Sequence, residues 1–414
     1  MIMNNSHVTS NCNFPMFLLA AFPILDYYYF GMSNFTFANV SSILLFIYTL
    51  LKGKFRFNKV PKSYYMYWAY SALQIYLIAG IGGWSDYIPG GVLFAIFSLC
   101  VFAYASYFNI YLLRKSMRLI FIVSSILWFY QNIIWFTTHV KISTFLPLTD
   151  SILTNHMTYN ELTRWQNEIG GELIERFSSL FTEPSHFAQY SLMLLCIELF
   201  IGDNKNKLYT KFSVIIVIML ILMQSGAGMM GIGFIAIVKL LYILLVTRRK
   251  KYYFYLALLV PLFVIGVRWY LNSQAGSYIS ARTEQLDYTN ETSTSSGFVR
   301  LYFGWYKYGE LSPVQKLLGT SRTAIGEMRE GGFFNGVTNI LCSQGLIGLL
   351  LLIVFYVKTC KKKVPYSGVT SLYLLFISLI ASTYLGGLML ISAAIALGTH
   401  WKTKYESNYL MSKQ

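Results

Sequence analysis

The chain has 414 residues, of which 55% are hydrophobic and only 12% are charged. A soluble protein of this length usually carries about a quarter charged residues, so the composition excludes an ordinary soluble enzyme. The net charge of +16 would suit a nucleic-acid-binding protein, but no basic soluble segment is present to bind nucleic acid. Repeated apolar runs of roughly 20 residues instead predict an all-α polytopic membrane protein.

Twelve such runs follow one another along the chain and predict about 12 transmembrane helices in a single integral membrane domain, residues 1–414. The first run has no basic start and no small-residue cleavage site, so we expect it to be a retained span. A run of tyrosines, Tyr27 to Tyr29, fits the aromatic belt at its end. The predicted spans are 14–31, 35–51, 63–81, 89–113, 117–138, 184–201, 210–224, 227–246, 252–271, 334–357, 366–384 and 385–400.

Most of the 33 basic residues lie in alternate connections between these spans. The positive-inside rule makes those connections, and both chain termini, cytoplasmic. Lys239, inside the eighth span, is expected to snorkel to the same interface. The basic groups occupy 52–62, 114–118, 205–211, 248–251, 358–363 and 402–413.

Two long connections, 139–183 and 272–333, are then placed on the outer face of the membrane. They hold most of the 17 acidic residues. The first is predicted to contain an amphipathic helix within 157–181, with Arg164 on its solvated face. In the second, Pro313 and several glycines predict a structured loop over 311–336.

Soluble-enzyme signatures are absent from the sequence: it has no Walker A loop, no H-E-x-x-H and no G-x-S-x-G. The five cysteines form no C-x-x-C pair, so we expect no metal and no cofactor. Carboxylates are rare within the spans, Asp26 and Glu198 being the examples, which weakens an ion-coupled transporter. The glycines of 224–233 predict close helix packing.

The stretch ERFSSLFTEPSHFAQY, residues 175–190, places charge where an apolar helix begins. Arg176 suits a lipid pyrophosphate, because a guanidinium binds phosphate bidentately and stays charged. Glu183 and His186 are candidate general bases, one helical turn apart. Simpler interpretations stay open: Glu183 only caps the helix, His186 is only interfacial, and Arg176 pairs with Glu172.

The second long connection supplies the expected partner residues. Arg300 is predicted to hold the same pyrophosphate, although it could simply anchor its helix at the interface. Arg322, Trp305 and Tyr306 complete the predicted substrate surface, the aromatic rings by stacking on sugars.

Three segments resemble the O-antigen polymerase and ligase superfamily, whose polymerases are the Wzy type. They are RFSSLFTEPSHFA (176–188), GFVRLYFGW (297–305) with LLGTS (317–321), and NILCSQGLIGLLL (339–351). The positions of the two long connections, after the fifth and ninth spans, are similar to those of the family. The spaced Arg-then-Gly repeats described for some members are absent from both connections.

The resemblance implies a metal-independent glycosyltransferase of a bacterial inner membrane, with the two long connections on the periplasmic face. It would move a growing glycan from undecaprenyl pyrophosphate onto a new lipid-linked repeat unit, with Arg176 and Arg300 on the pyrophosphate and Glu183 or His186 as base. Expected partners are this lipid-linked oligosaccharide, membrane lipid and a chain-length regulator protein. Two alternatives remain: a ligase that transfers glycan onto lipid A-core, and a lipid-linked-sugar flippase or other transporter. Family ligases carry a histidine in the second long connection, and this chain has none there.

Overall fold

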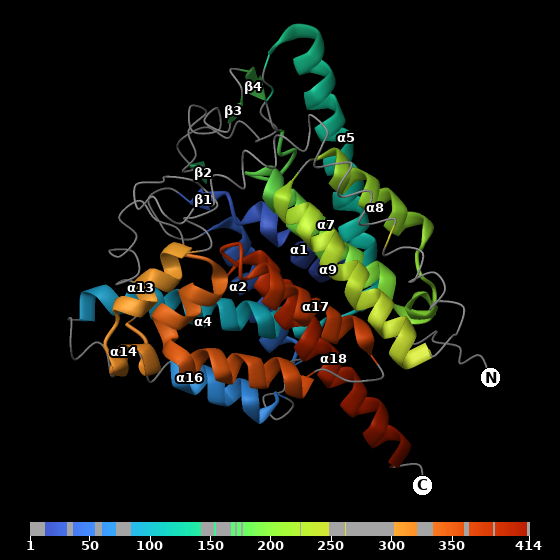
Figure 1. Cartoon of the computed structure of the whole chain (residues 1–414). Coiled ribbons are helices and arrows are strands. Elements are labelled where there is room, and N and C mark those ends of the chain that lie inside the picture. Colours follow the sequence, from blue (N-terminus) through green and yellow to red (C-terminus); the bar gives the residue numbers. More distant parts are fainter. Residues whose placement is uncertain are drawn as a thin grey trace.

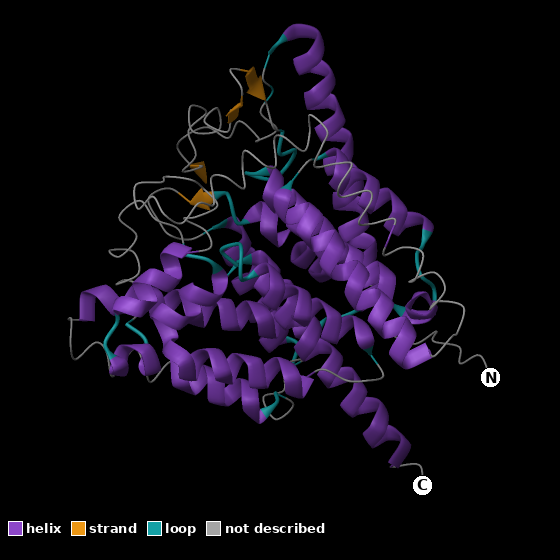
Figure 2. Ribbon diagram, viewed as in Figure 1, coloured by secondary structure: helices purple, strands orange, loops and turns teal. Residues whose placement is uncertain are grey.

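Helices make up most of what the structure describes, as the purple ribbons of Figure 2 show. The structure is a computed structural model. The residues it describes are 13–30, 36–53, 60–71, 84–140, 142, 153–154, 167–169, 172–174, 177–223, 225–247, 261, 302–320, 334–359, 364–383 and 386–411.

The helices before the first long connection are α1 (Asn13–Leu25), α2 (Phe37–Leu51), a segment over 62–71, α4 (Trp84–Ser106) and α5 (Ile110–Thr138). Between the two long connections follow α7 (Pro184–Phe200), η3 (Gly202–Asn206), α8 (Lys211–Leu222), α9 (Gly226–Tyr242) and η4 (Ile243–Thr247). The last group is α13 (Gly304–Glu310), α14 (Pro313–Leu318), α16 (Gly336–Thr359), α17 (Pro365–Ile377) and α18 (Gly387–Met411).

Membrane character is clear in three of these helices, which are long and apolar enough to cross a bilayer. They are Ile110–Thr138, Gly226–Val246 and Gly336–Thr359. A span needs about 20 apolar residues, and α8 and α17 have 12 and 13. The chain therefore has the helices of an α-helical membrane protein. The predicted span 252–271 lies outside the described residues, apart from residue 261.

Several predicted span boundaries are wrong: α1 ends at Leu25 and not at 31, α17 ends at Ile377 and not at 384, and α18 continues to Met411 and not to 400. The boundary between α4 and α5 is wrong as well. We expected a connection at 114–116, but α4 ends at Ser106 and α5 begins at Ile110. The cause is a local cap: the Asn109 side chain accepts hydrogen bonds from the backbone N–H groups of Tyr111 and Leu112 at 3.1 and 3.4 Å. Asparagine is a favoured N-cap residue, so the helix starts there and its basic residues lie inside it.

The predicted surface helix within 157–181 is also wrong where the structure describes it. Strands β3 (Asn167–Ile169) and β4 (Glu172–Ile174) pair antiparallel, with Ile169 opposite Glu172. The two residues between them in sequence are glycines, and a Gly-Gly pair between short runs is a hairpin signal. A second short pair joins β1 (Tyr29–Phe30) to β2 (Leu153–Thr154), linking the end of α1 to this connection.

The loop expected after Pro313 is instead the short helix α14. Ser312 caps it by accepting from the Gln315 N–H at 3.3 Å, while the Gln315 side chain accepts from the Ser312 N–H at 3.1 Å. Proline is favoured at the first helical position because its missing N–H has no helical partner there. Pro313 therefore starts a helix instead of breaking one.

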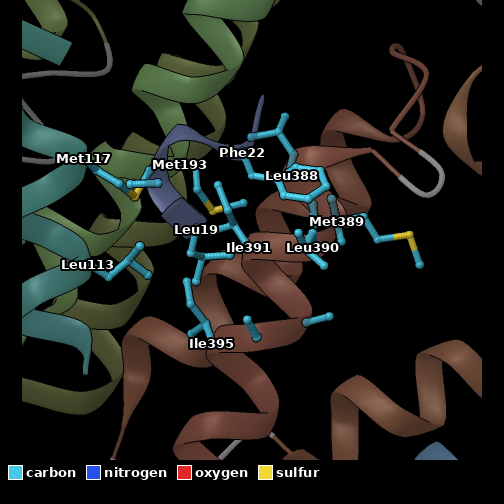
Figure 3. Packing of buried hydrophobic residues seen from close by; sticks show 14 of the residues in the cluster. Leu19, Phe22, Leu113, Met117, Met193, Leu388, Met389, Leu390, Ile391 and Ile395 are labelled. Atoms are coloured by element: carbon cyan, nitrogen blue, oxygen red, sulfur yellow. The ribbon is translucent and has the colours of Figure 1, made fainter. Parts of the chain in front are cut away.

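Helix α7 is the centre of the bundle and packs against α5, α8, α9 and α17 (Figure 1). Its side chains from Phe187 to Phe200 are all buried, as expected for a helix that is apolar on every side. The predicted close packing of the glycine-rich segment is confirmed, because a Cβ at Gly231 of α9 would overlap the Leu192 side chain of α7. Figure 3 shows the neighbouring core, which is built from Leu19, Phe22, Leu113, Met117, Met193, Leu388, Leu390, Ile391 and Ile395.

Candidate functional site

The candidate site lies where α7 begins. Glu183 occupies the N-cap position with an extended backbone, and Pro184 starts the helix. The Glu183 carboxylate does not accept from the backbone N–H groups of α7. It accepts instead from the Ser185 hydroxyl at 2.7 Å. The Glu183 side chain therefore does not cap the helix. Glu183 is half-buried and lies at the N-terminal end of α7.

His186 is fixed by two hydroxyl groups. Its Nδ1 lies 2.8 Å from Thr182 Oγ1 and 3.0 Å from Tyr27 Oη. The Tyr27 and His186 rings are nearly parallel, with centroids 6.1 Å apart. The two hydroxyls fix the position of the imidazole ring through Nδ1. A positioned histidine of this kind is suited to general acid–base chemistry near neutral pH.

Tyr27 was missed by the sequence analysis, which placed it in an aromatic belt. It belongs to the turn after α1, where Asp26 accepts from the Thr36 hydroxyl at 2.8 Å. Thr36 in turn caps α2 by accepting from the Asn39 N–H at 3.2 Å. The turn after α1 therefore contacts the start of α2 through Asp26 and the start of α7 through Tyr27. The sequence signal for Tyr27 was its position beside Asp26 at the end of the first predicted span. That signal could not indicate that its partner is His186, 159 residues away.

The second group of predicted substrate residues lies on α13, which packs against α16 at one edge of the molecule (left in Figure 1). We name Tyr302, Trp305 and Tyr306 the aromatic ledge. Their exposed fractions are 44%, 42% and 51%, and the Tyr302 and Tyr306 rings stack with centroids 6.4 Å apart. Exposed aromatic rings of this kind can stack on sugar rings or lie at a membrane interface.

The ledge carries a charged pair beside the rings. Lys307 lies 5.8 Å from the Tyr306 ring centroid and 3.2 Å from Glu310. Hydrogen bonds from Tyr306 and then from Lys307 lower the pKa of Glu310. The carboxylate is fully exposed to solvent, so the pair adds little to stability and mainly orients the Lys307 side chain over the ring.

The three predicted arginines, Arg176, Arg300 and Arg322, lie outside the described residues. Their placement relative to Glu183 and His186 therefore stays a prediction. Glu183 and His186 lie together on α7, and Trp305 and Tyr306 lie together on α13.

An ion cluster at the opposite end of α7 was also missed. Glu198 is fully buried, and both its oxygens accept hydrogen bonds from the guanidinium groups of Arg114 and Arg118. The sequence analysis treated the two arginines as topology signals because it placed them in a connection. The i,i+4 spacing of Arg114 and Arg118 on one helix face was the signal that could have paired them.

Lys239 of α9 does not snorkel to the interface as expected. It is 2% exposed, and its Nζ donates to the carbonyl oxygens of Leu199, Asn204 and Lys205 at 2.6, 3.1 and 3.1 Å. A cation at the C-terminal end of a helix is favoured because the last carbonyls have no helical donor. Lys239 thus holds the turn that follows α7.

A buried polar seam joins the second long connection to the bundle. Gln344 of α16 accepts from Tyr67 at 2.9 Å and donates to Ser71 at 2.9 Å. At Gly345 the backbone of α16 kinks with φ +68°, and a Cβ there would overlap the Leu317 carbonyl of α14. Only glycine adopts this conformation without strain at such a close approach. The seam fixes α14 against α16.

Among the residues that the structure describes, no three His, Cys, Asp or Glu side chains are grouped so that they could hold a metal ion. No family model, curated protein or solved structure matches this chain.

Proposed function

We propose that this protein is a polymerase of lipid-linked oligosaccharide repeat units. The observation that carries the proposal is the start of α7, where Tyr27 and Thr182 hold His186 one turn after Glu183. The segment that forms this site is also the segment whose residues resemble the O-antigen polymerases. A fixed base at the end of a buried helix suits chemistry on a lipid-linked substrate.

The proposed reaction transfers the growing glycan from undecaprenyl pyrophosphate to a hydroxyl of a new lipid-linked unit. His186 or Glu183 accepts the proton of the attacking hydroxyl as the new glycosidic bond forms. The bond between the sugar and the pyrophosphate breaks, and the negative charge on the leaving group grows. Arg176 and Arg300 would stabilise that charge more in the transition state than in the ground state.

The proposed topology has twelve spans, both termini in the cytoplasm, and the two long connections on the periplasmic face of the inner membrane. It is supported by the distribution of basic residues. It places the start of α7 on the outer side, where flipped lipid-linked units are available. The aromatic ledge would bind the sugars, and a chain-length regulator protein is the expected protein partner.

The experiment replaces Arg176 or Arg300 by alanine and measures the length of the surface polysaccharide together with membrane insertion. We expect both variants to insert normally and to lose chain extension. Arg164→Ala is the matched control, since Arg164 lies in the same connection as Arg176 and is given no role in the proposed site. Normal long-chain polysaccharide from both Arg176→Ala and Arg300→Ala would overturn the assignment.

Deleting the gene separates the polymerase from its two rivals. A missing polymerase leaves single repeat units on the core lipid. Accumulation of all repeat units on the outer lipid carrier would instead identify a ligase, and accumulation on the cytoplasmic side would identify a flippase.

A further inference from the structure

The ion cluster at the C-terminal end of α7 carries more positive charge than its carboxylate balances. Arg114 binds Glu198 through Nε and Nη2 at 2.8 Å each, and Arg118 binds the same carboxylate through the same two atoms. Two guanidiniums thus share one fully buried carboxylate. Charge beside apolar helices is costly unless it is neutralised, so a second anion is expected here.

The two guanidiniums are accessible to such an anion. The side chains of Arg114 and Arg118 are 21% and 33% exposed, while that of Glu198 is inaccessible. Each guanidinium has five N–H donors, and Glu198 takes two from each. Within the described part of the chain, neither arginine makes another side-chain hydrogen bond. The remaining donors match the bidentate geometry of a phosphate group.

The surroundings add to the positive charge. The turn after α7 and the start of α8 meet α5 here, since Arg118 lies 4.5 Å from the ring centroid of Phe212 and Asn204 donates to the Glu198 carbonyl. Asp203 is the one acidic residue in this turn. The basic side chains on the same elements are Lys115, Lys205, Lys207 and Lys211.

Apolar side chains are also exposed on the two helices whose residues surround the guanidiniums. On α5, Leu119 directly follows Arg118 and Ile122 lies one turn beyond it, and their exposed fractions are 53% and 43%. On α8, Val214, Ile215 and Ile218 are exposed by 41%, 53% and 52%. A free phosphate ion would make no use of this surface, whereas the acyl chains of a lipid would cover it.

We propose that Arg114 and Arg118 form a binding site for an anionic phospholipid of the inner leaflet. The headgroup phosphate binds the two guanidiniums, and the acyl chains lie along the exposed faces of α5 and α8. The site is at the opposite end of α7 from His186; its place in the inner leaflet rests on the proposed topology, but the binding does not depend on the proposed polymerase activity.

The test uses the full-length protein in neutral detergent micelles. Its thermal unfolding midpoint is measured while phosphatidylglycerol or phosphatidylcholine with the same acyl chains is added, and separately with inorganic phosphate. Because ligand binding to the folded state raises the midpoint, we expect a saturable rise with phosphatidylglycerol alone. Arg118→Gln keeps one arginine on Glu198 and is expected to weaken phosphatidylglycerol binding about tenfold by removing a bidentate phosphate contact.

Lys115→Gln is the matched control, since it removes the same charge from an exposed position of the same helix. The proposal is overturned if phosphatidylcholine stabilises equally, which would show a general lipid effect. It is also overturned if inorganic phosphate reproduces the shift, or if Lys115→Gln weakens binding as much as Arg118→Gln. The comparison of the three additives on the unmodified protein decides the matter even if Arg118→Gln fails to fold.

Discussion

Helix α7 carries a glutamate at each end, and the two are held differently. Glu183 is half-buried and accepts from a neutral hydroxyl, that of Ser185. Glu198 is fully buried, and each of its oxygens accepts from two guanidiniums. The first carboxylate is partly exposed at the start of the helix, and the second serves as a counterion inside the bundle. The same residue type is therefore the proposed base at one end and a buried ion-pair partner at the other.

The cations follow the same division. At the C-terminal end of α7, Arg114, Arg118 and Lys239 oppose the negative end of the helix macrodipole, and Lys239 also binds the last carbonyls. At the N-terminal end, His186 is held by the hydroxyls of Tyr27 and Thr182. This contrast predicts that substitutions at the C-terminal end lower stability and that those at the N-terminal end lower activity.

The largest expected effect is that of Glu198→Ala. It leaves two guanidiniums facing each other without their carboxylate, and breaking a buried ion pair costs about 3–5 kcal/mol. Glu183→Gln, by contrast, keeps an acceptor for Ser185 and is expected to change the free energy of unfolding by less than about 1 kcal/mol. Unfolding in detergent, followed by circular dichroism, measures both. Equal losses in the two variants would remove the distinction between the two ends of α7.

Lys239→Met comes next. It removes three hydrogen bonds from an ammonium group to the carbonyls after α7, and we expect a loss of about 2 kcal/mol in unfolding free energy. Lys211→Met is the control, because Lys211 is exposed at the start of α8 and its replacement is expected to change stability by no more than about 0.5 kcal/mol. The same unfolding measurement applies. A harmless Lys239→Met would mean that the buried ammonium does not hold this turn.

The smallest effect is expected from Tyr27→Phe. Thr182 still holds Nδ1 of His186, so one hydrogen bond worth about 1 kcal/mol is lost and chain extension slows about fivefold to tenfold. The free energy of unfolding is expected to fall by no more than about 1 kcal/mol, and His186→Gln is expected to abolish the reaction. Polymer length made from a lipid-linked repeat unit in isolated membranes reports the rate. Tyr130→Phe, on the exposed face of α5, is the control. A Tyr27→Phe protein that is less stable but fully active would assign Tyr27 a structural role only.

Much of the helical framework was predictable from the sequence. Hydropathy marked the positions of α2, α7 to α9 and α16 within a few residues and the starts of α1 and α18, because long apolar runs form helices in lipid. The wrongly predicted element boundaries arose where one or two residues set the local structure, because an averaged hydropathy does not detect such short signals. Asn109 moved the start of α5, the two glycines before Glu172 accompany a strand pair, and Ser312 began a helix at Pro313.

The candidate site was predictable in part. Glu183 and His186 were recognisable because polar residues at the start of an apolar helix are rare and the two residues are only three positions apart in the sequence. Tyr27 was not, because its hydrogen bond to His186 joins residues 159 apart in the chain. Glu198 was visible as an isolated carboxylate, but its partners Arg114 and Arg118 lie 84 and 80 residues away.

The sequence by itself determined that this is a helical membrane protein, where its apolar helices lie, and which end of α7 is rich in polar groups. Only the tertiary structure decided which polar groups meet. Hydropathy and helix caps depend on a few neighbouring residues, so helices and their ends can be predicted from short stretches of the sequence. The partners of a buried charge or a ring nitrogen are set by how α1, α5, α7 and α9 pack together, and no local pattern records that arrangement.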